Sequence, residues 1–248
     1  MCFTIGSMAH GPASTGTAKA IAGRSKGRDL AEFAIAYALI LVVIWTPRPW
    51  QRVLWWVAAA AVILITAISF EGFRSMGLRA ANFRRSLWIA AAALLAAGVA
   101  VAVAARLGTL HLPGGIIAFI ETYVGYSIWS GVQEFLLQGF FLLRFLRLIP
   151  NPRLAAMTAA TLFAAAHLPN PILTPITLIW GLAACLLFLR YRNLYSLALA
   201  HAILGIAVAV TIPGPVDHNM RVGLGYLTYG HRRHADRLYL QVHPSPKP

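Results

Sequence analysis

The sequence contains little charge and few acidic residues. Charged residues make up 11% of its 248 residues and hydrophobic residues 59%, whereas a soluble globular chain is about a quarter charged. This composition excludes an ordinary soluble domain. A mean hydropathy of +0.69 and long apolar runs predict instead a polytopic helical membrane protein. We therefore expect an all-α transmembrane bundle of about seven to eight spans.

Cysteines, targeting signals and repeats are also scarce. Cys2 lies in a polar terminal segment and Cys185 in an apolar run, so neither a disulfide framework nor a cysteine-ligated metal is expected. Residues 1–28 lack the apolar core of a cleavable signal peptide, and their small and basic residues predict a disordered basic tail. The chain shows no internal repeat, which argues against a transporter built from repeated halves.

The net charge is strongly positive, at +14 from 21 Lys and Arg against 7 Asp and Glu. Such an excess can indicate nucleic-acid binding. Here the arginines fall between apolar runs, where they anchor helix ends at lipid headgroups, so no nucleic-acid partner is expected. In a seven-span topology the N-terminal tail and segments 71–85, 144–153 and 190–192 share one side. The positive-inside rule then predicts a cytoplasmic N-terminus, although the basic C-terminal tail falls on the other side.

Apolar segments alternate with basic or Gly- and Pro-containing connections. The expected spans are 30–46, 53–70, 87–105, 116–148, 154–168, 174–189 and 194–212. The segment 116–148 is longer than one span requires, so it is expected to be long, tilted or broken, with an eighth span if it divides. Residues 29–215 would form the membrane domain, followed by a polar basic tail at 216–248.

Three ionisable side chains lie within the apolar segments. Glu134 is in the long fourth segment, and His167 and His201 are each in a later one. An ionisable group inside a membrane is costly and faces the protein interior or a wet cavity, which makes it a functional candidate. Counted from the basic turns, Glu134 and His201 come out near the midplane and His167 somewhat shallower. We expect the three side chains to meet in one cavity.

A carboxylate and two histidines in a protected pocket suit hydrolysis. The acid and one histidine can hold and deprotonate a water molecule, while the other histidine donates a hydrogen bond to a developing oxyanion. The same three groups can also bind Zn²⁺. No His-Glu-x-x-His motif occurs, so no metal cofactor is expected and zinc stays an unsupported option. In the alternative interpretation, each polar side chain only joins helices by a hydrogen bond.

The motifs around these residues resemble those of a known family. They read Gln133-Glu134-x-x-x-Gln138-Gly139, Phe163-Ala-Ala-Ala-His167 and His201-Ala-Ile-Leu-Gly205. In that order they resemble the Glu-Glu-x-x-x-Arg, Phe-x-x-x-His and His-x-x-x-Asn patterns of the CPBP intramembrane proteases, the CAAX prenyl endopeptidase and bacteriocin-processing family also called ABI. The resemblance covers roughly residues 125–210, within a motif core at 116–212.

The resemblance implies an integral membrane endopeptidase, expected in a bacterial inner membrane. Its partners would be membrane lipid and a membrane-embedded or prenylated peptide, cleaved in or near the bilayer. Glu134 and His167 would activate water, and His201 would polarise the carbonyl. Two alternatives stay open: a catalytically inactive scaffold or immunity-type protein, and a small transporter or proton relay.

Three positions depart from the family pattern. Gln133 replaces the first glutamate, Gln138 the arginine and Gly205 the asparagine. Because an amide cannot accept a proton, the base would be Glu134, with Gln138 orienting it. The donor missing at Gly205 would come from Gln133 or from a backbone N–H. Asn170, just after the second motif, joins Gln133 and Gln138 as expected support for the substrate or oxyanion.

Overall fold

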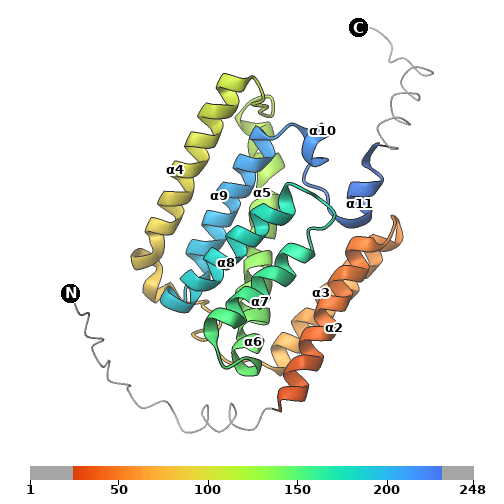
Figure 1. Ribbon diagram of the computed structural model, residues 1–248, viewed down its shortest axis with the longest axis vertical. Coiled ribbons are helices and arrows are strands. Elements are labelled where there is room, and N and C mark those ends of the chain that lie inside the picture. Colours follow the sequence, from red (N-terminus) through yellow and green to blue (C-terminus); the bar gives the residue numbers. More distant parts are fainter. Residues whose placement is uncertain (1–24, 231–248) are drawn as a thin grey trace.

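The chain is built from helices alone over the residues that the structure describes. The computed structural model describes residues 25–230 (Figure 1). Its elements are α2 (Lys26–Trp45), α3 (Trp50–Ile68), η1 (Ala80–Asn82), α4 (Phe83–Leu107), α5 (Ile116–Glu134), η2 (Phe135–Leu142), α6 (Leu143–Leu148), α7 (Pro152–Ala165), α8 (Leu173–Tyr191), α9 (Leu194–Thr211), α10 (Gly214–Asp217) and α11 (Gly223–Leu227). The expected all-α fold is confirmed. Most of the two expected tails, residues 1–24 and 231–248, lies outside the described residues.

Within residues 25–230, four helices are long and apolar enough to cross a membrane. They are Trp50–Ile68, Ala80–Leu107, Leu173–Tyr191 and Leu194–Thr211. The expected count of seven to eight spans is not confirmed. The first turns of α2 carry Lys26, Arg28, Asp29 and Glu32, and α7 has only 14 residues. Crossing the hydrocarbon core takes about 20 apolar residues, so α7 alone is too short.

The long segment 116–148 is one continuous helix that changes from α-helical to π-helical geometry and back. The α-helix α5 ends at Glu134, and η2 continues it as a π-helix up to Leu142 before α6 completes the segment. π-Helical turns are rare and often occur at functional sites. The π-helical turns begin directly after Glu134, so the hydrogen-bond pattern of the helix changes at the first motif. The segment does not divide into two separate helices.

Buried ion pairs join α2 to α6 at the end of the bundle where α2 begins. The guanidinium of Arg144 lies 2.7 Å from a carboxylate oxygen of Glu32. One turn along α6, the guanidinium of Arg147 lies 2.6 Å from Asp29 and also pairs with Glu71. A buried charge without a partner is costly, so these pairs hold α6 in one position against α2.

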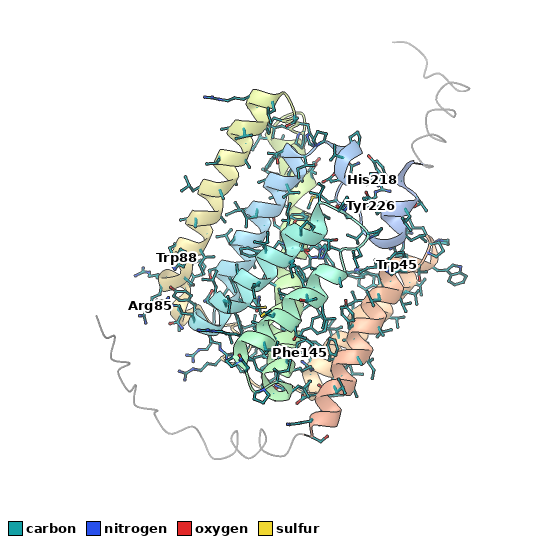
Figure 2. All side chains as sticks on the ribbon, in the orientation of Figure 1. Trp45, Arg85, Trp88, Phe145, His218 and Tyr226 are labelled. Atoms are coloured by element: carbon teal, nitrogen blue, oxygen red, sulfur yellow. The ribbon has the colours of Figure 1, made fainter. Side chains whose placement is uncertain are left out.

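The basic segments meet at this same end of the bundle. The side-chain amide of Asn82 donates to the carbonyl oxygen of Tyr191 at 2.9 Å, and that of Asn193 donates to the carbonyl oxygen of Arg79 at 2.8 Å. The connection between α3 and α4 therefore lies beside the turn between α8 and α9. Figure 2 labels Arg85, Trp88 and Phe145 toward this end, and His218, Tyr226 and Trp45 toward the other.

Part of the expected C-terminal tail folds back onto the opposite end of the bundle, where α10 and α11 lie (Figure 1). Asn170 holds it there and has no exposed surface. Its Nδ2 donates to the carbonyl oxygens of Asp217 and Arg221 at 2.8 and 3.0 Å. Its Oδ1 accepts from two backbone N–H groups of its own turn. Asn170 thus joins the α7–α8 turn to residues 214–230.

Candidate active site

Glu134 lies fully buried at the junction of α5 and η2. Its Oε1 is 2.7 Å from Nε1 of Trp180 and 2.9 Å from Nδ1 of His201. Its Oε2 is 3.3 Å from Nε2 of Gln138. The indole and amide nitrogens can only donate, so the carboxylate is their acceptor. Side chains from α8, α9 and η2 thus converge on one carboxylate.

His201 is 7% exposed and presents one ring nitrogen to Glu134. An imidazole N–H that donates to a carboxylate fixes the tautomer of the neutral ring. With the proton on Nδ1, the lone pair of His201 is on Nε2, which is then an acceptor. The ring also packs against Trp180, with centroids 5.9 Å apart.

His167 is fixed in the same tautomer by a different partner. It lies just beyond the end of α7, half-buried, with Nδ1 2.8 Å from the carbonyl oxygen of Phe163. A carbonyl oxygen can only accept, so Nδ1 carries the proton and Nε2 the lone pair. The ring of Phe163 contacts both histidines, with centroids 4.9 Å from His167 and 6.2 Å from His201. Both imidazoles thus have Nε2 as the acceptor nitrogen.

One cavity of about 450 Å³ brings the two histidines together. His167, His201 and Gln133 line this histidine cavity, as do Tyr37 and Tyr126. Glu134 is not part of its wall and reaches it through His201. The cavity therefore offers two acceptor nitrogens, one of them supported by a carboxylate.

A second cavity of about 450 Å³ lies on the other side of His201. Its wall is mostly apolar and includes Ala96, Ala97, Ala100, Ile176, Ile179, Leu204 and Gly205. This apolar cavity shares Tyr126, Leu173, Thr177, His201 and Met220 with the histidine cavity. His201 and Tyr126 consequently belong to the walls of both cavities.

The partnership of Glu134 differs from the sequence-based expectation. The sequence predicted that Glu134 acts with His167, whereas the structure pairs it with His201. The reason is the packing of α5 against α9, while α7 packs mainly against α8. Gln138 contacts Glu134, and Gln133 lines the cavity. The side chain of Asn170 instead bonds to backbone groups at the α7–α8 turn. It has no polar atom left to support the substrate or oxyanion, which is the role that the sequence had suggested.

Two residues of the site carried a signal that sequence analysis passed over. Trp180 lies in the middle of an apolar segment, away from the interfacial belts where tryptophan concentrates in membrane proteins. A buried indole N–H usually finds a hydrogen-bond partner, so a mid-span tryptophan indicates a buried acceptor. Tyr126, in the long fourth segment, likewise carries a polar hydroxyl on an aromatic ring inside an apolar segment, which indicates a buried hydrogen-bond partner.

The described part of the chain contains no cluster of side chains suited to bind a metal ion. No group of three His, Cys, Asp or Glu side chains among residues 25–230 is placed to hold one. Both oxygens of Glu134 already accept hydrogen bonds. Cys185 is a free, buried thiol, and Cys2 lies outside the described residues.

Comparison with known proteins identifies the segment that carries this site. Residues 116–207 match the model of a family described as type II CAAX prenyl endopeptidase Rce1-like. No curated protein and no solved structure matches the chain. The matched segment runs from α5 into α9 and contains Glu134, His167 and His201. With its four apolar helices the chain is an integral membrane protein. Its residues 116–207 are similar to the type II CAAX prenyl endopeptidase family, which is consistent with the CPBP resemblance of its motifs.

Proposed function

We propose that this protein is an intramembrane endopeptidase that hydrolyses a peptide bond in or near the bilayer. The observation that carries the proposal is the 2.9 Å contact between Oε1 of Glu134 and Nδ1 of His201, at the wall of a cavity that also holds His167. Water occupies about 30 Å³ in the liquid, so a cavity of about 450 Å³ has room for a water molecule and part of a substrate.

In this mechanism His201 is the general base and His167 holds the attacking water. The water oxygen bonds to the carbonyl carbon while its proton passes to Nε2 of His201, and the π electrons of the carbonyl move to its oxygen. When the C–N bond breaks, the imidazolium returns the proton to the leaving amine nitrogen. Glu134 stabilises the imidazolium between these steps. Protons and electrons balance without a metal or other cofactor.

The role of Glu134 is therefore indirect. The sequence assigned it direct deprotonation of water, but Oε1 accepts from Trp180 and His201, and Oε2 accepts from Gln138. A carboxylate held in this way orients His201 and fixes its tautomer. Gln138 positions the carboxylate, and Gln133 faces the histidine cavity as a hydrogen-bond donor for the substrate.

We propose a membrane-embedded or prenylated peptide as the substrate. The family description names a prenyl endopeptidase, and the apolar cavity next to His201 suits an apolar group. We place the protein in a bacterial inner membrane with its N-terminus in the cytoplasm. The collection of basic segments at one end of the bundle supports this orientation.

The test uses the purified full chain in proteoliposomes. Three peptides are offered: a farnesylated peptide ending in a CAAX sequence, the same peptide unmodified, and an apolar membrane-spanning peptide. Cleavage of at least one, detected by mass spectrometry, is expected for the wild type. Loss of a residue that acts with the general base costs about 10³-fold or more, so Glu134→Gln and His201→Gln should be inactive.

The matched control is Glu121→Gln, which changes an exposed acid on the same helix as Glu134. This variant should cleave at the wild-type rate. Failure of the wild type to cleave any of the three peptides, or cleavage that Glu134→Gln leaves intact, would overturn the proposed function in favour of a non-catalytic membrane scaffold.

A further inference from the structure

The phenol of Tyr126 lies against the backbone of Gly205. A Cβ atom added to Gly205 would overlap the hydroxyl oxygen of Tyr126 and crowd the adjacent ring carbon. Gly205 is buried in α9, four residues after His201. Residues four apart share a helix face, so the phenol reaches the face of α9 that carries the candidate base.

The backbone does not require glycine at position 205. Gly205 is absent from the described glycines with positive φ, and it continues α9 as an ordinary helical residue. Glycine in the interior of a helix is unfavourable because it loses the most conformational freedom on folding. The lack of a side chain at this position therefore serves the close approach of Tyr126.

Hydrolysis needs a hydrogen-bond donor at the carbonyl oxygen, where negative charge develops. Neither histidine provides one in its neutral form, because His167 donates its Nδ1–H to Phe163 and His201 donates its own to Glu134. Their Nε2 atoms can only accept. The donor must therefore come from another residue. Gln133 lines the histidine cavity alone, whereas Tyr126 lines both cavities, as His201 does.

We propose that Tyr126 is a catalytic residue whose hydroxyl donates a hydrogen bond to the carbonyl oxygen of the scissile peptide. The proposal rests on the proposed function and deepens it. The phenol keeps its proton throughout, while the proton that moves passes between water, His201 and the leaving amine. Tyr126 thus supplies the donor that the sequence lacks at Gly205.

The first test is Tyr126→Phe, which removes the hydroxyl and keeps the ring against Gly205. Removal of one oxyanion donor costs about 10²- to 10³-fold in kcat. We expect a loss of that size, a KM within about twofold and an unchanged melting temperature, because packing is preserved. The control is Tyr195→Phe, which removes a phenol from an exposed tyrosine on α9 and should leave kcat unchanged.

The second test supplies the hydrogen-bond donor from α9 in place of Tyr126 on α5. Gly205→Asn alone should fail to fold or to cleave, since its side chain would overlap Tyr126. The double variant Tyr126→Ala with Gly205→Asn makes room for the amide, whose Nδ2 can donate at the same place. We expect its kcat to exceed that of Tyr126→Ala by at least about tenfold, since one donor is worth more than that. If Tyr126 were only structural, the double variant would regain the melting temperature of the wild type but not its kcat.

The outcomes separate this inference from the proposed function. Wild-type kcat in Tyr126→Phe, together with inactivity of Glu134→Gln, would overturn the role of Tyr126 and leave the peptidase intact. If Gln133 were the donor instead, Gln133→Leu would lower kcat while Tyr126→Phe would not. Cleavage that persists in Glu134→Gln would overturn the proposed function itself.

Discussion

Trp180 donates its indole N–H to Oε1 of Glu134 over 2.7 Å in the middle of the bundle. The tryptophan comes from α8 and the carboxylate from the end of α5, and the same oxygen also faces Nδ1 of His201. Two donors on one oxygen hold the carboxylate in a single orientation. The direction in which His201 presents its free nitrogen to the cavity therefore depends on a residue of a third helix.

Removing the indole N–H should weaken both stability and catalysis. Trp180→Phe keeps an aromatic ring against His201 but takes a partner from a buried acceptor, which costs about 1–3 kcal/mol of unfolding free energy. A similar loss of orientation in the transition state corresponds to about a tenfold lower kcat. Thermal unfolding in detergent and initial rates measure the two effects. Trp56→Phe, at a residue 66% exposed, is the control, and equal losses there would contradict the assigned contact.

Glu134 should be energetically coupled to His201 and not to His167. Residues in direct contact show coupling free energies of about 0.5–3 kcal/mol in double-mutant cycles, and separated residues add within about 0.5 kcal/mol. The cycle of Glu134→Gln with His201→Gln is therefore expected to be strongly non-additive in unfolding free energy. The parallel cycle with His167→Gln should be additive. Coupling of the opposite pattern would restore the partnership that the sequence suggested.

The buried pair of Arg144 and Glu32 should be important for stability without touching the site. Arg144→Met removes one of the two arginine partners of Glu32, which keeps its ion pair with Arg28 at 2.8 Å. Breaking a buried pair on one side costs about 3–5 kcal/mol when no partner remains, so we expect a loss of about 1–3 kcal/mol here. The control is Arg153→Met, at an exposed arginine in the first turn of α7, where surface substitutions stay within about 0.5 kcal/mol. Chemical denaturation in mild detergent measures both. Similar effects of the two variants would disprove the role given to the ion pair.

Asn170 is expected to be a structural residue of the α7–α8 turn. Asn170→Asp keeps the shape of the side chain but turns its donor into an acceptor facing the carbonyl oxygens of Asp217 and Arg221. Each buried polar group without a partner costs about 1–3 kcal/mol, so unfolding free energy should fall by roughly that amount or more. Limited proteolysis should then cut faster within residues 214–230. A variant of wild-type stability that has lost kcat would instead favour the expected role of Asn170 in supporting the substrate or oxyanion.

Chelators should leave the proposed activity unchanged. Residues 25–230 contain no group of three potential ligands placed for a metal ion, and the proposed proton transfers use only side chains. Rates measured with 1,10-phenanthroline and with EDTA should equal the untreated rate. Inhibition that added Zn²⁺ reverses would contradict the metal-free mechanism.

Composition and local pattern were sufficient for the class of the protein and for the choice of its candidate site residues. Hydropathy is a property of short segments, so the sequence alone indicated apolar helices, and the cost of burying charge marked Glu134 and His201 as unusual. The three motifs predicted a resemblance to the CAAX proteases, and the family match at residues 116–207 is consistent with it. The same local quantities did not fix the number of spans. Four helices of the described residues are long and apolar enough to cross, and α7 is too short to cross on its own.

Only the tertiary structure decided which polar groups meet. Glu134 and His201 are 67 residues apart along the chain, and their contact depends on how α5 and α9 cross. The indole of Trp180, the burial of Asn170 in a turn and the phenol of Tyr126 against Gly205 depend likewise on helix packing. Hydrophobic burial is nearly non-directional and can be estimated one residue at a time, whereas hydrogen bonds require two particular atoms within about 3 Å. A linear sequence therefore determines the membrane helices and their candidate residues, and the fold determines which of those residues act together.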